Sequence, residues 1–379
     1  MDFTWSTEHR QIREMVATFA DEEIAPRAEE IDATDEFPHD LIDEMSELGL
    51  LGMPFPIELG GAGLDYHAYA LALEEISRAS GAVGTIIAAH TSLAGNMLYE
   101  YADDDQQEEY LIPLNEGSEI GAFALSEPQA GSDVPAMETT AERDGDEYVL
   151  NGPKLWISNG SVADTIVTFA KTEPASGYRG ISSFIVRADD PGFNVERTED
   201  KLGDRGCPTA ELAYKDVRIP VERRIGKEGA GFRQALETLN GGRITIAARG
   251  VGIAQASLDA ALEYAQDREQ FGQPIAEFQA IQHKLADMDT KVQAARLLTH
   301  RAADRKIRGA KFIKEAAQAK LFASEVSREV ANEGIQIHGG YGYVKAFPVE
   351  RFYRDAKLNE IYEGTSEVLR NTIASQLLD

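Results

Sequence analysis

The chain has 379 residues, of which 43% are hydrophobic, and a formal net charge of −28. This length is too great for one small core, so we expect two or three packed layers or domains. The acidic balance disfavours nucleic acid as a partner, because the phosphate backbone repels such a surface. No run of about 18 apolar residues occurs, and the first residues lack the basic and apolar regions of a signal peptide. We therefore expect a soluble, cytoplasmic protein with no integral membrane association.

The acidic residues are concentrated in one part of the chain. Residues 1–150 contain 34 Asp and Glu, 5 Arg and no Lys, a net charge of −29, whereas the remainder carries +1. Only 13 of the 37 basic residues are lysine. An acidic, lysine-poor surface suggests a halophilic protein kept soluble in high salt, where screening weakens self-repulsion. An acidic protein from a mesophile is the alternative.

The cysteine and histidine content disfavours disulfide and metal chemistry. Cys207 is the single cysteine, which rules out an internal disulfide and a cysteine-cluster metal site. No histidine lies near it in sequence, so a small buried filler is the expected role. The seven histidines form no His-Glu-x-x-His motif, and we expect no metal.

The N-terminal region, residues 1–120, is expected to be all α-helical. Apolar residues recur at helical spacing after Ser6, and Pro26 is expected to bend or end that helix. Two apolar helices are expected near Tyr66–Arg78 and Ala82–Tyr101. The acidic cluster Asp103–Asp105 is expected to cap a further helix.

The period of the apolar pattern changes at Ile120. Short runs rich in Val, Ile, Phe and Tyr alternate with turn signals, which is typical of antiparallel strands. We expect residues 121–226 to form a central antiparallel β-barrel or sandwich domain. Strands without intervening helices exclude a doubly wound fold.

Residues 227–379 are expected to form a C-terminal four-helix-bundle domain. Long helical patterns cover roughly 230–266, 277–307, 310–336, 348–360 and 366–378, with short connections. The fold class is thus α+β and multidomain, in the order α, β, α. Two glycine-rich stretches, Gly226–Gly231 and Gly340–Lys345, match neither a Walker loop nor a dinucleotide fingerprint.

The stretch Ile361–Glu367 is the strongest candidate for a catalytic loop. Gly364 allows close backbone approach, and Thr365 is suited to cap the helix that follows. The loop holds Glu363 just outside a helix N-terminus, a suitable place for a general base. Taken alone, the stretch favours a solvated loop glutamate beside an ordinary helix cap over a catalytic one.

Five motifs are spaced along the chain, namely Phe123–Asp133, Trp156–Gly160, Arg268–Ile275, Gln336–Gly342 and Ile361–Glu367. Together, and in this order, they resemble the acyl-CoA dehydrogenase family. The first resembles the first signature of that family, and the second resembles its second flavin-contacting strand. The resemblance covers essentially the whole chain and agrees with the α, β, α order, so it favours a catalytic Glu363.

The resemblance implies FAD as cofactor and assigns roles to matched positions. Glu363 is the implied catalytic base. The implied FAD-binding residues are Phe123, Leu125, Ser126, Trp156, Ser158, Arg268, Phe271, Gln279, Gln336, Gly339, Gly340, Thr365 and Glu367. The implied substrate contacts are Ser132, Arg243, Tyr362 and Gly364.

The resemblance also implies a reaction and partners. The reaction is dehydrogenation of an acyl-CoA thioester to the trans-2-enoyl-CoA, a step of fatty acid β-oxidation, with electrons passed to an electron-transferring flavoprotein. The Glu363 carboxylate takes the α-proton, and its backbone N–H helps to stabilise the charge that develops on the thioester oxygen. A homotetramer is implied, in which the Arg268 and Gln336 segments grip FAD across a subunit boundary. The segment Ala88–Leu93 most resembles the short-chain branch.

Three alternatives remain open at this point. One is a flavin oxidase or monooxygenase of the same fold, and another is a helical scaffold that has lost its cofactor. The third is a dehydrogenase for a branched or dicarboxylic acyl-CoA. No basic residue occurs in Ala88–Leu98 to neutralise a distal carboxylate, which disfavours a dicarboxylic substrate.

Overall fold

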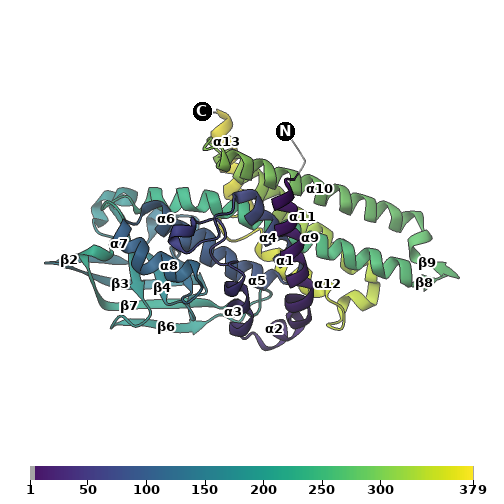
Figure 1. Ribbon diagram of the computed structural model, residues 1–379, viewed down its shortest axis with the longest axis horizontal. Helices are drawn as coiled ribbons and strands as arrows, with labels where there is room; N and C mark the ends of the chain where they lie inside the picture. The colour runs from purple at the N-terminus through teal and green to yellow at the C-terminus, as the bar shows by residue number, and fades with distance from the viewer. Residues whose placement is uncertain (1–4, 379) are drawn as a thin grey trace.

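The computed structural model describes residues 5–378, which form a β-sheet flanked by helices. In Figure 1 the sheet lies at the left, the long C-terminal helices extend to the right, and the N-terminal helices lie across both. The expected order of helical, β and helical regions is confirmed. Among the described helices, none is long and apolar enough to cross a bilayer.

The N-terminal helices are short and begin at residues that suit a helix start. The Ser6 hydroxyl accepts a hydrogen bond from the His9 N–H at 3.1 Å and so caps α1, and Pro26 falls in a 3₁₀ turn soon after it. Asp103 and Gln106 form a capping box at α7, as the acidic cluster predicts. The segments are α1 (Thr7–Phe19), η1 (Ala20–Ile24), η2 (Ala25–Arg27), α2 (Ala28–Thr34), α3 (His39–Glu47), η3 (Ile57–Leu59), α4 (Tyr66–Ala79), α5 (Gly81–Ile87), η4 (Ala88–Gly95), α6 (Asn96–Tyr101), α7 (Asp104–Gln106), η5 (Gln107–Leu111) and α8 (Ile112–Asn115).

The central sheet is mixed, which differs in detail from the purely antiparallel pairing expected from the sequence. Its order is β1-β4-β2-β3-β7-β6, with β5 paired to β4, and β1 and β2 both run parallel to β4. All four residues of β1 are buried, and such a continuous apolar run is typical of a parallel strand covered on both faces. The polar β2 and β6 were missed by the sequence analysis because they lack an apolar alternation. The strands are β1 (Gly121–Ala124), β2 (Thr140–Asp144), β3 (Glu147–Ser158), β4 (Thr165–Lys171), β5 (Ile181–Arg187), β6 (Phe193–Thr198) and β7 (Thr209–Pro220), with 3₁₀ turns at η6 (Val134–Ala136), η7 (Pro174–Gly180) and η8 (Val221–Arg223).

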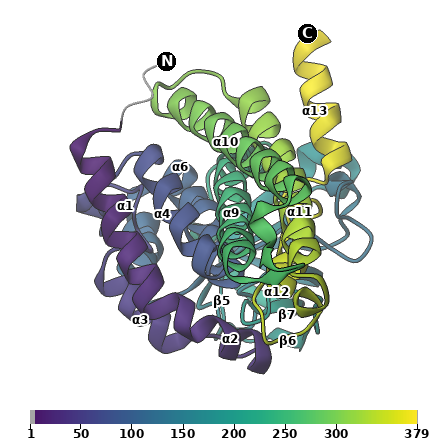
Figure 2. The same ribbon diagram turned by 90° about the vertical axis from the view of Figure 1, so that its right-hand side faces the viewer.

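The C-terminal helices surround α9, whose 37 residues span about 55 Å at 1.5 Å per residue. In Figure 2 the helices follow one another across the molecule from α1 through α4 and α9 to α11. The N-terminal half of α9 lies beside the sheet, and its far end leads to a two-stranded hairpin, β8–β9. The elements are α9 (Gly231–Asp267), β8 (Glu269–Gln270), β9 (Gln273–Pro274), η9 (Ile275–Glu277), α10 (Gln279–Ile307), α11 (Ile313–His338), η10 (Gly339–Tyr343), α12 (Val349–Leu358) and α13 (Ser366–Leu378).

A fully buried arginine ties the three regions together. Arg249 on α9 is 0% exposed, donates from Nε to the carbonyl oxygen of Gly81 at 3.0 Å, and pairs with Asp204 of the β-region. It also donates to the side chain of Asn359, just after α12. A buried charge is stable only when its hydrogen bonds are satisfied. The bond to Arg249 therefore holds Asn359, the first residue after α12, in place.

Candidate active site

A cavity of about 700 Å³ opens between the sheet, α9 and the loop at residues 359–365. Its volume is in the usual range for a small-molecule site. The α9 side chains of Leu236, Leu239 and Arg243 form one wall. Eleven residues singled out from the sequence line it, namely Phe123, Leu125, Ser126, Ser132, Trp156, Ser158, Arg243, Tyr362, Glu363, Gly364 and Thr365.

Glu363 brings a buried carboxylate oxygen to this cavity. The residue adopts a left-handed backbone with φ of 51°, and its Oε2 is buried without a hydrogen-bond partner among the described residues. Burial raises the pKa of Glu363 from 4.5 to about 7, although the nearby charges of Lys320 and Arg243 favour the ionised form. A carboxyl group with such a pKa is suited to accept a proton near neutral pH.

The helix after the loop begins as the sequence predicts. The Thr365 hydroxyl accepts a hydrogen bond from the Val368 N–H at 3.3 Å and so caps α13. Glu367 is exposed at the first turn of α13, and hydrogen bonds with its own backbone N–H and with Thr365 lower its pKa. It does not line the cavity, so the structure separates it from Glu363.

The sheet contributes an aromatic wall to the cavity. Trp156 is 59% exposed and has φ of 64°, at an irregularity where the β3–β7 register shifts between Lys154 and Ile157. Neither the Ser126 nor the Ser158 side chain hydrogen-bonds to another described residue. An exposed indole beside unengaged hydroxyls suits a flat polar ring system as ligand.

The remaining candidates from the sequence lie away from this cavity, in and near the hairpin end of the molecule. Arg268 lies over the ring of Tyr341 at 5.5 Å, and Phe271 is 95% exposed. Gly339 and Gly340 have no atom within 4 Å of the position that a Cβ would occupy. Within one chain the structure does not bring this group, Arg268, Phe271, Gln279, Gln336, Gly339 and Gly340, to Glu363.

The residues implied to contact the substrate lie at different depths in the cavity. Ser132 is exposed at the cavity wall, whereas Arg243 is buried and donates from Nη1 to the Asn240 side chain at 2.7 Å. Tyr362 has a buried hydroxyl with no partner among the described residues, and its ring lies 5.8 Å from the guanidinium of Arg249. Gly364 has φ of 97°, a conformation that favours glycine.

The sequence analysis missed two residues next to Glu363. Lys320 on α11 is fully buried and hydrogen-bonds to the loop that carries Glu363, and Gly242 on α9 faces the carboxylate. The sequence does contain a signal for Lys320, because this lysine occupies a core position in an otherwise apolar helical pattern. A charged group there needs a specific partner.

Other titratable groups near the site are structural. His90 in η4 contacts the Leu114 carbonyl oxygen and the Gly121 N–H, both at 3.0 Å, and burial lowers its pKa to about 4. Cys207 is buried, as expected, and burial raises its pKa to about 12. Within residues 5–378, no three His, Cys, Asp or Glu side chains are arranged to hold a metal ion.

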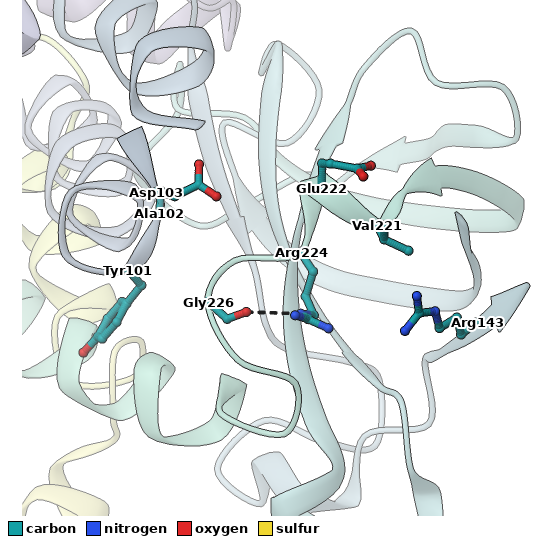
Figure 3. Close-up of a pocket in the computed structure, with 8 residues that line it drawn as sticks. All are labelled: Tyr101, Ala102, Asp103, Arg143, Val221, Glu222, Arg224 and Gly226. Carbon is teal, nitrogen blue, oxygen red and sulfur yellow. Dashed lines mark hydrogen bonds between the residues drawn. The ribbon is translucent and has the colours of Figure 1, made fainter. Parts of the chain in front are cut away.

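A second cavity, of about 530 Å³, lies between the α6–α7 connection and the sheet and shares no lining residue with the first (Figure 3). Two of its charged groups, Arg224 and Asp103, have partners nearby. Arg224 donates to the carbonyl oxygen of Gly226 at 3.1 Å, and Asp103 caps α7. This cavity contains no group with the unpaired, buried character of Glu363.

Comparisons with known proteins agree with this geometry over the whole chain. Three family models match in order, namely the acyl-CoA dehydrogenase N-terminal domain at residues 6–118, the middle domain at 122–217 and the C-terminal domain at 229–378. The chain belongs to the acyl-CoA dehydrogenase family. It is therefore an FAD-dependent oxidoreductase, as the sequence motifs imply.

Individual relatives cover both chains completely or nearly so. The short-chain-specific acyl-CoA dehydrogenase of Clostridium acetobutylicum is 45% identical over 377 residues, with 100% of both chains covered. The butyryl-CoA dehydrogenase of Megasphaera elsdenii has a TM-score of 0.98 at 41% identity, with 100% of both chains covered. A chain from the structural study of the electron transferring flavoprotein of Acidaminococcus fermentans and flavin-based electron bifurcation has a TM-score of 0.99 at 46% identity, again with 100% of both chains covered.

The residues of the cavity fit the flavin ring of FAD. Trp156 and Phe123 offer aromatic surface, and the unengaged hydroxyls of Ser126 and Ser158 offer hydrogen bonds to its polar edge. When bound, FAD supplies the acceptor for a hydride equivalent.

Proposed function

We propose that this chain dehydrogenates a short-chain acyl-CoA thioester to the trans-2-enoyl-CoA and passes the electrons to an electron-transferring flavoprotein. The observation that carries the proposal is the Glu363 carboxylate, which faces the cavity with a buried, unpartnered Oε2 and a pKa raised to about 7. An α-proton of a thioester is weakly acidic. Its removal therefore needs a base held at the reacting carbon and a way to stabilise the enolate-like charge.

The loop provides both the base and a donor that stabilises the enolate-like charge. Glu363 takes the α-proton through its carboxylate. Its backbone N–H has no hydrogen bond to another described residue, so this donor remains available for the thioester oxygen. Leu93, Leu239 and Ile246 line the cavity and exclude water once the thioester is bound, which strengthens these interactions.

The size of the cavity supports a short acyl chain. A flavin ring and the thioester portion of the substrate share about 700 Å³, which leaves limited room for a hydrocarbon tail. Two of the relatives described above act on short-chain substrates by name, which supports the same class here.

The outlying residues support an assembly in which subunits share the cofactor. Gln336, Gly339 and Gly340 are exposed and Arg268 is half-buried, and none of them lines the cavity of its own chain. We propose that they bind the FAD of a neighbouring subunit in a homotetramer. An arginine suits the pyrophosphate because its guanidinium makes paired, charge-assisted hydrogen bonds.

We further propose that the acidic surface is an adaptation to high salt. The excess charge lies in residues 1–150, and α1 and α3 lie at the outer edge of the molecule in Figure 2. Screening by salt reduces the repulsion between these charges.

A panel of acyl-CoA thioesters of increasing length and branching, assayed with an artificial electron acceptor, tests the activity and its substrate class. Highest kcat/KM with a straight short chain is the expected result. Oxygen uptake in the same assay, without the acceptor, would instead favour a flavin oxidase. Reduction of a purified electron-transferring flavoprotein by the enzyme and its acyl-CoA substrate tests the partner separately.

A further inference from the structure

Lys320 connects helix α11 to the loop that carries Glu363. The residue is 0% exposed, and its Nζ donates to the carbonyl oxygen of Tyr362 at 2.8 Å and to that of Gly364 at 2.7 Å. These two carbonyls belong to the residues on either side of Glu363. One side chain therefore holds the backbone immediately before and after the base.

The loop needs such an anchor because it has little regular structure of its own. Glu363 and Gly364 have φ of 51° and 97°, so neither continues α12 or begins α13. A buried carbonyl without a donor is costly, and α13 starts only at Ser366. The two bonds from Lys320 satisfy carbonyls that no helix in this region satisfies.

The anchor continues one turn along the same face of α11. The Ser324 hydroxyl donates to the carbonyl oxygen of Asn359 at 2.8 Å, and the Asn359 amide donates to the Ser327 hydroxyl at 3.2 Å. Residues 320 and 324 are four apart and thus share one face of a helix. This face of α11 holds the start of the loop as well as the catalytic glutamate.

We propose that Lys320 is a positioning residue that fixes the catalytic loop and aims the Glu363 carboxylate through its hydrogen bonds to Tyr362 and Gly364. The inference rests on the proposed role of Glu363 as the base. It assigns to Lys320 no contact with substrate or cofactor.

The charge of Lys320 adds a second, measurable effect. Burial raises the pKa of Glu363 to about 7, and the positive charge of Lys320 is the largest influence in the opposite direction, followed by Arg243 on α9. Burial also lowers the pKa of Lys320 to about 7. Tyr66 and Tyr69 on α4 and Tyr362 in the loop are also near Glu363. Burial, with a smaller contribution from the Glu363 charge, raises the pKa values of these phenols and keeps them neutral.

The test compares Lys320→Met with Lys306→Met in the FAD-loaded protein. Lys306 on α10 is a matched control, because it is a partly buried lysine whose Nζ lies 4.5 Å from the ring of Tyr66 and hydrogen-bonds to no carbonyl of the described chain. In Lys320→Met we expect amide hydrogen exchange at residues 361–366 to rise roughly tenfold or more, with other segments unchanged. We expect kcat to fall on the order of 10- to 100-fold. The midpoint of the acidic limb of kcat/KM should rise by about one pH unit.

Equal exchange at residues 361–366 and an equal pH midpoint in the two variants would overturn the inference, even if both lose activity. If Lys320→Met does not fold, Lys320→Gln is measured in its place. Glutamine is a shorter, neutral donor, so hydrogen exchange at residues 361–366 and the pH midpoint should change in the same direction but by less. An unmodified protein that oxidises no acyl-CoA would contradict the proposed function instead. The exchange comparison would still decide whether Lys320 anchors the loop.

Discussion

The Cα of Gly242 lies against the carboxylate of Glu363. A Cβ at position 242 would fall well inside van der Waals distance of Oε2 and 3.0 Å from Cδ2 of Leu93. Only the absence of a side chain on α9 at this point leaves room for the carboxylate. The position of the Glu363 carboxylate therefore depends on a residue of helix α9.

Gly242→Ala should displace the Glu363 carboxylate and lower kcat on the order of 10- to 100-fold, because a shift of about 1 Å costs that much in a positioned group. FAD content and melting temperature should change little, since alanine favours a helix. Gly241→Ala is the matched control, because a Cβ there would lie 3.1 Å from the hydroxyl of Tyr66 and would not meet Glu363. Steady-state kinetics of both variants provide the measurement, and equal activity would contradict the steric argument.

Glu363→Gln keeps the shape of the side chain and removes its basicity. We expect turnover to fall by roughly two to four orders of magnitude while FAD remains bound. Glu14→Gln, at an exposed position of α1 that does not line the cavity, should leave turnover within about twofold of the unmodified enzyme. Near-normal activity of Glu363→Gln would remove Glu363 from the role of base.

The pH dependence should report the raised pKa of Glu363. The base works only as a carboxylate, and burial moves its pKa from 4.5 to about 7. Activity should thus rise with pH through about 7 and be largely lost one to two units below it. The acidic limb of kcat/KM measures this pKa in the free enzyme. A profile that stays flat down to about pH 5 would show that the carboxyl group has an ordinary pKa.

Arg268→Ala should weaken FAD retention and subunit assembly together, because we propose that this arginine binds the cofactor of a neighbouring subunit. Sizing by light scattering and the ratio of flavin to protein absorbance measure the two effects. Arg308→Ala serves as the control, because Arg308 is exposed and pairs only with Asp304 among residues 5–378. A monomer that holds stoichiometric FAD would refute the shared site.

The melting temperature should rise from low salt into molar KCl. The Debye length falls from about 10 Å at 0.1 M to about 3 Å at 1 M, so repulsion among the charges of residues 1–150 shrinks. The stabilisation should be greatest in the N-terminal helices, which hydrogen exchange at several KCl concentrations resolves. A melting temperature that is flat or declining between about 0.1 and 2 M would contradict the adaptation to salt.

Much of this protein could be predicted from sequence alone, because the signals involved are local. Helical periodicity, the change of period at Ile120 and the caps at Asp103 and Thr365 depend on residues a few positions apart. The motifs around Phe123, Trp156 and Glu363 also indicated the family before any geometry was known. The polar edge strand β6 could not be predicted from the sequence, because its side chains are largely exposed and show no alternation of apolar and polar residues.

Only the tertiary structure decided what surrounds Glu363. Lys320 and Gly242 lie far from Glu363 in the chain, and their contacts with its loop exist only because α9, α11 and the loop pack together. The raised pKa of Glu363 has the same origin, since burial is a property of the packed site rather than of the residue. The sequence determined which group could act as a base, and packing decided where that group points and at what pH it ionises.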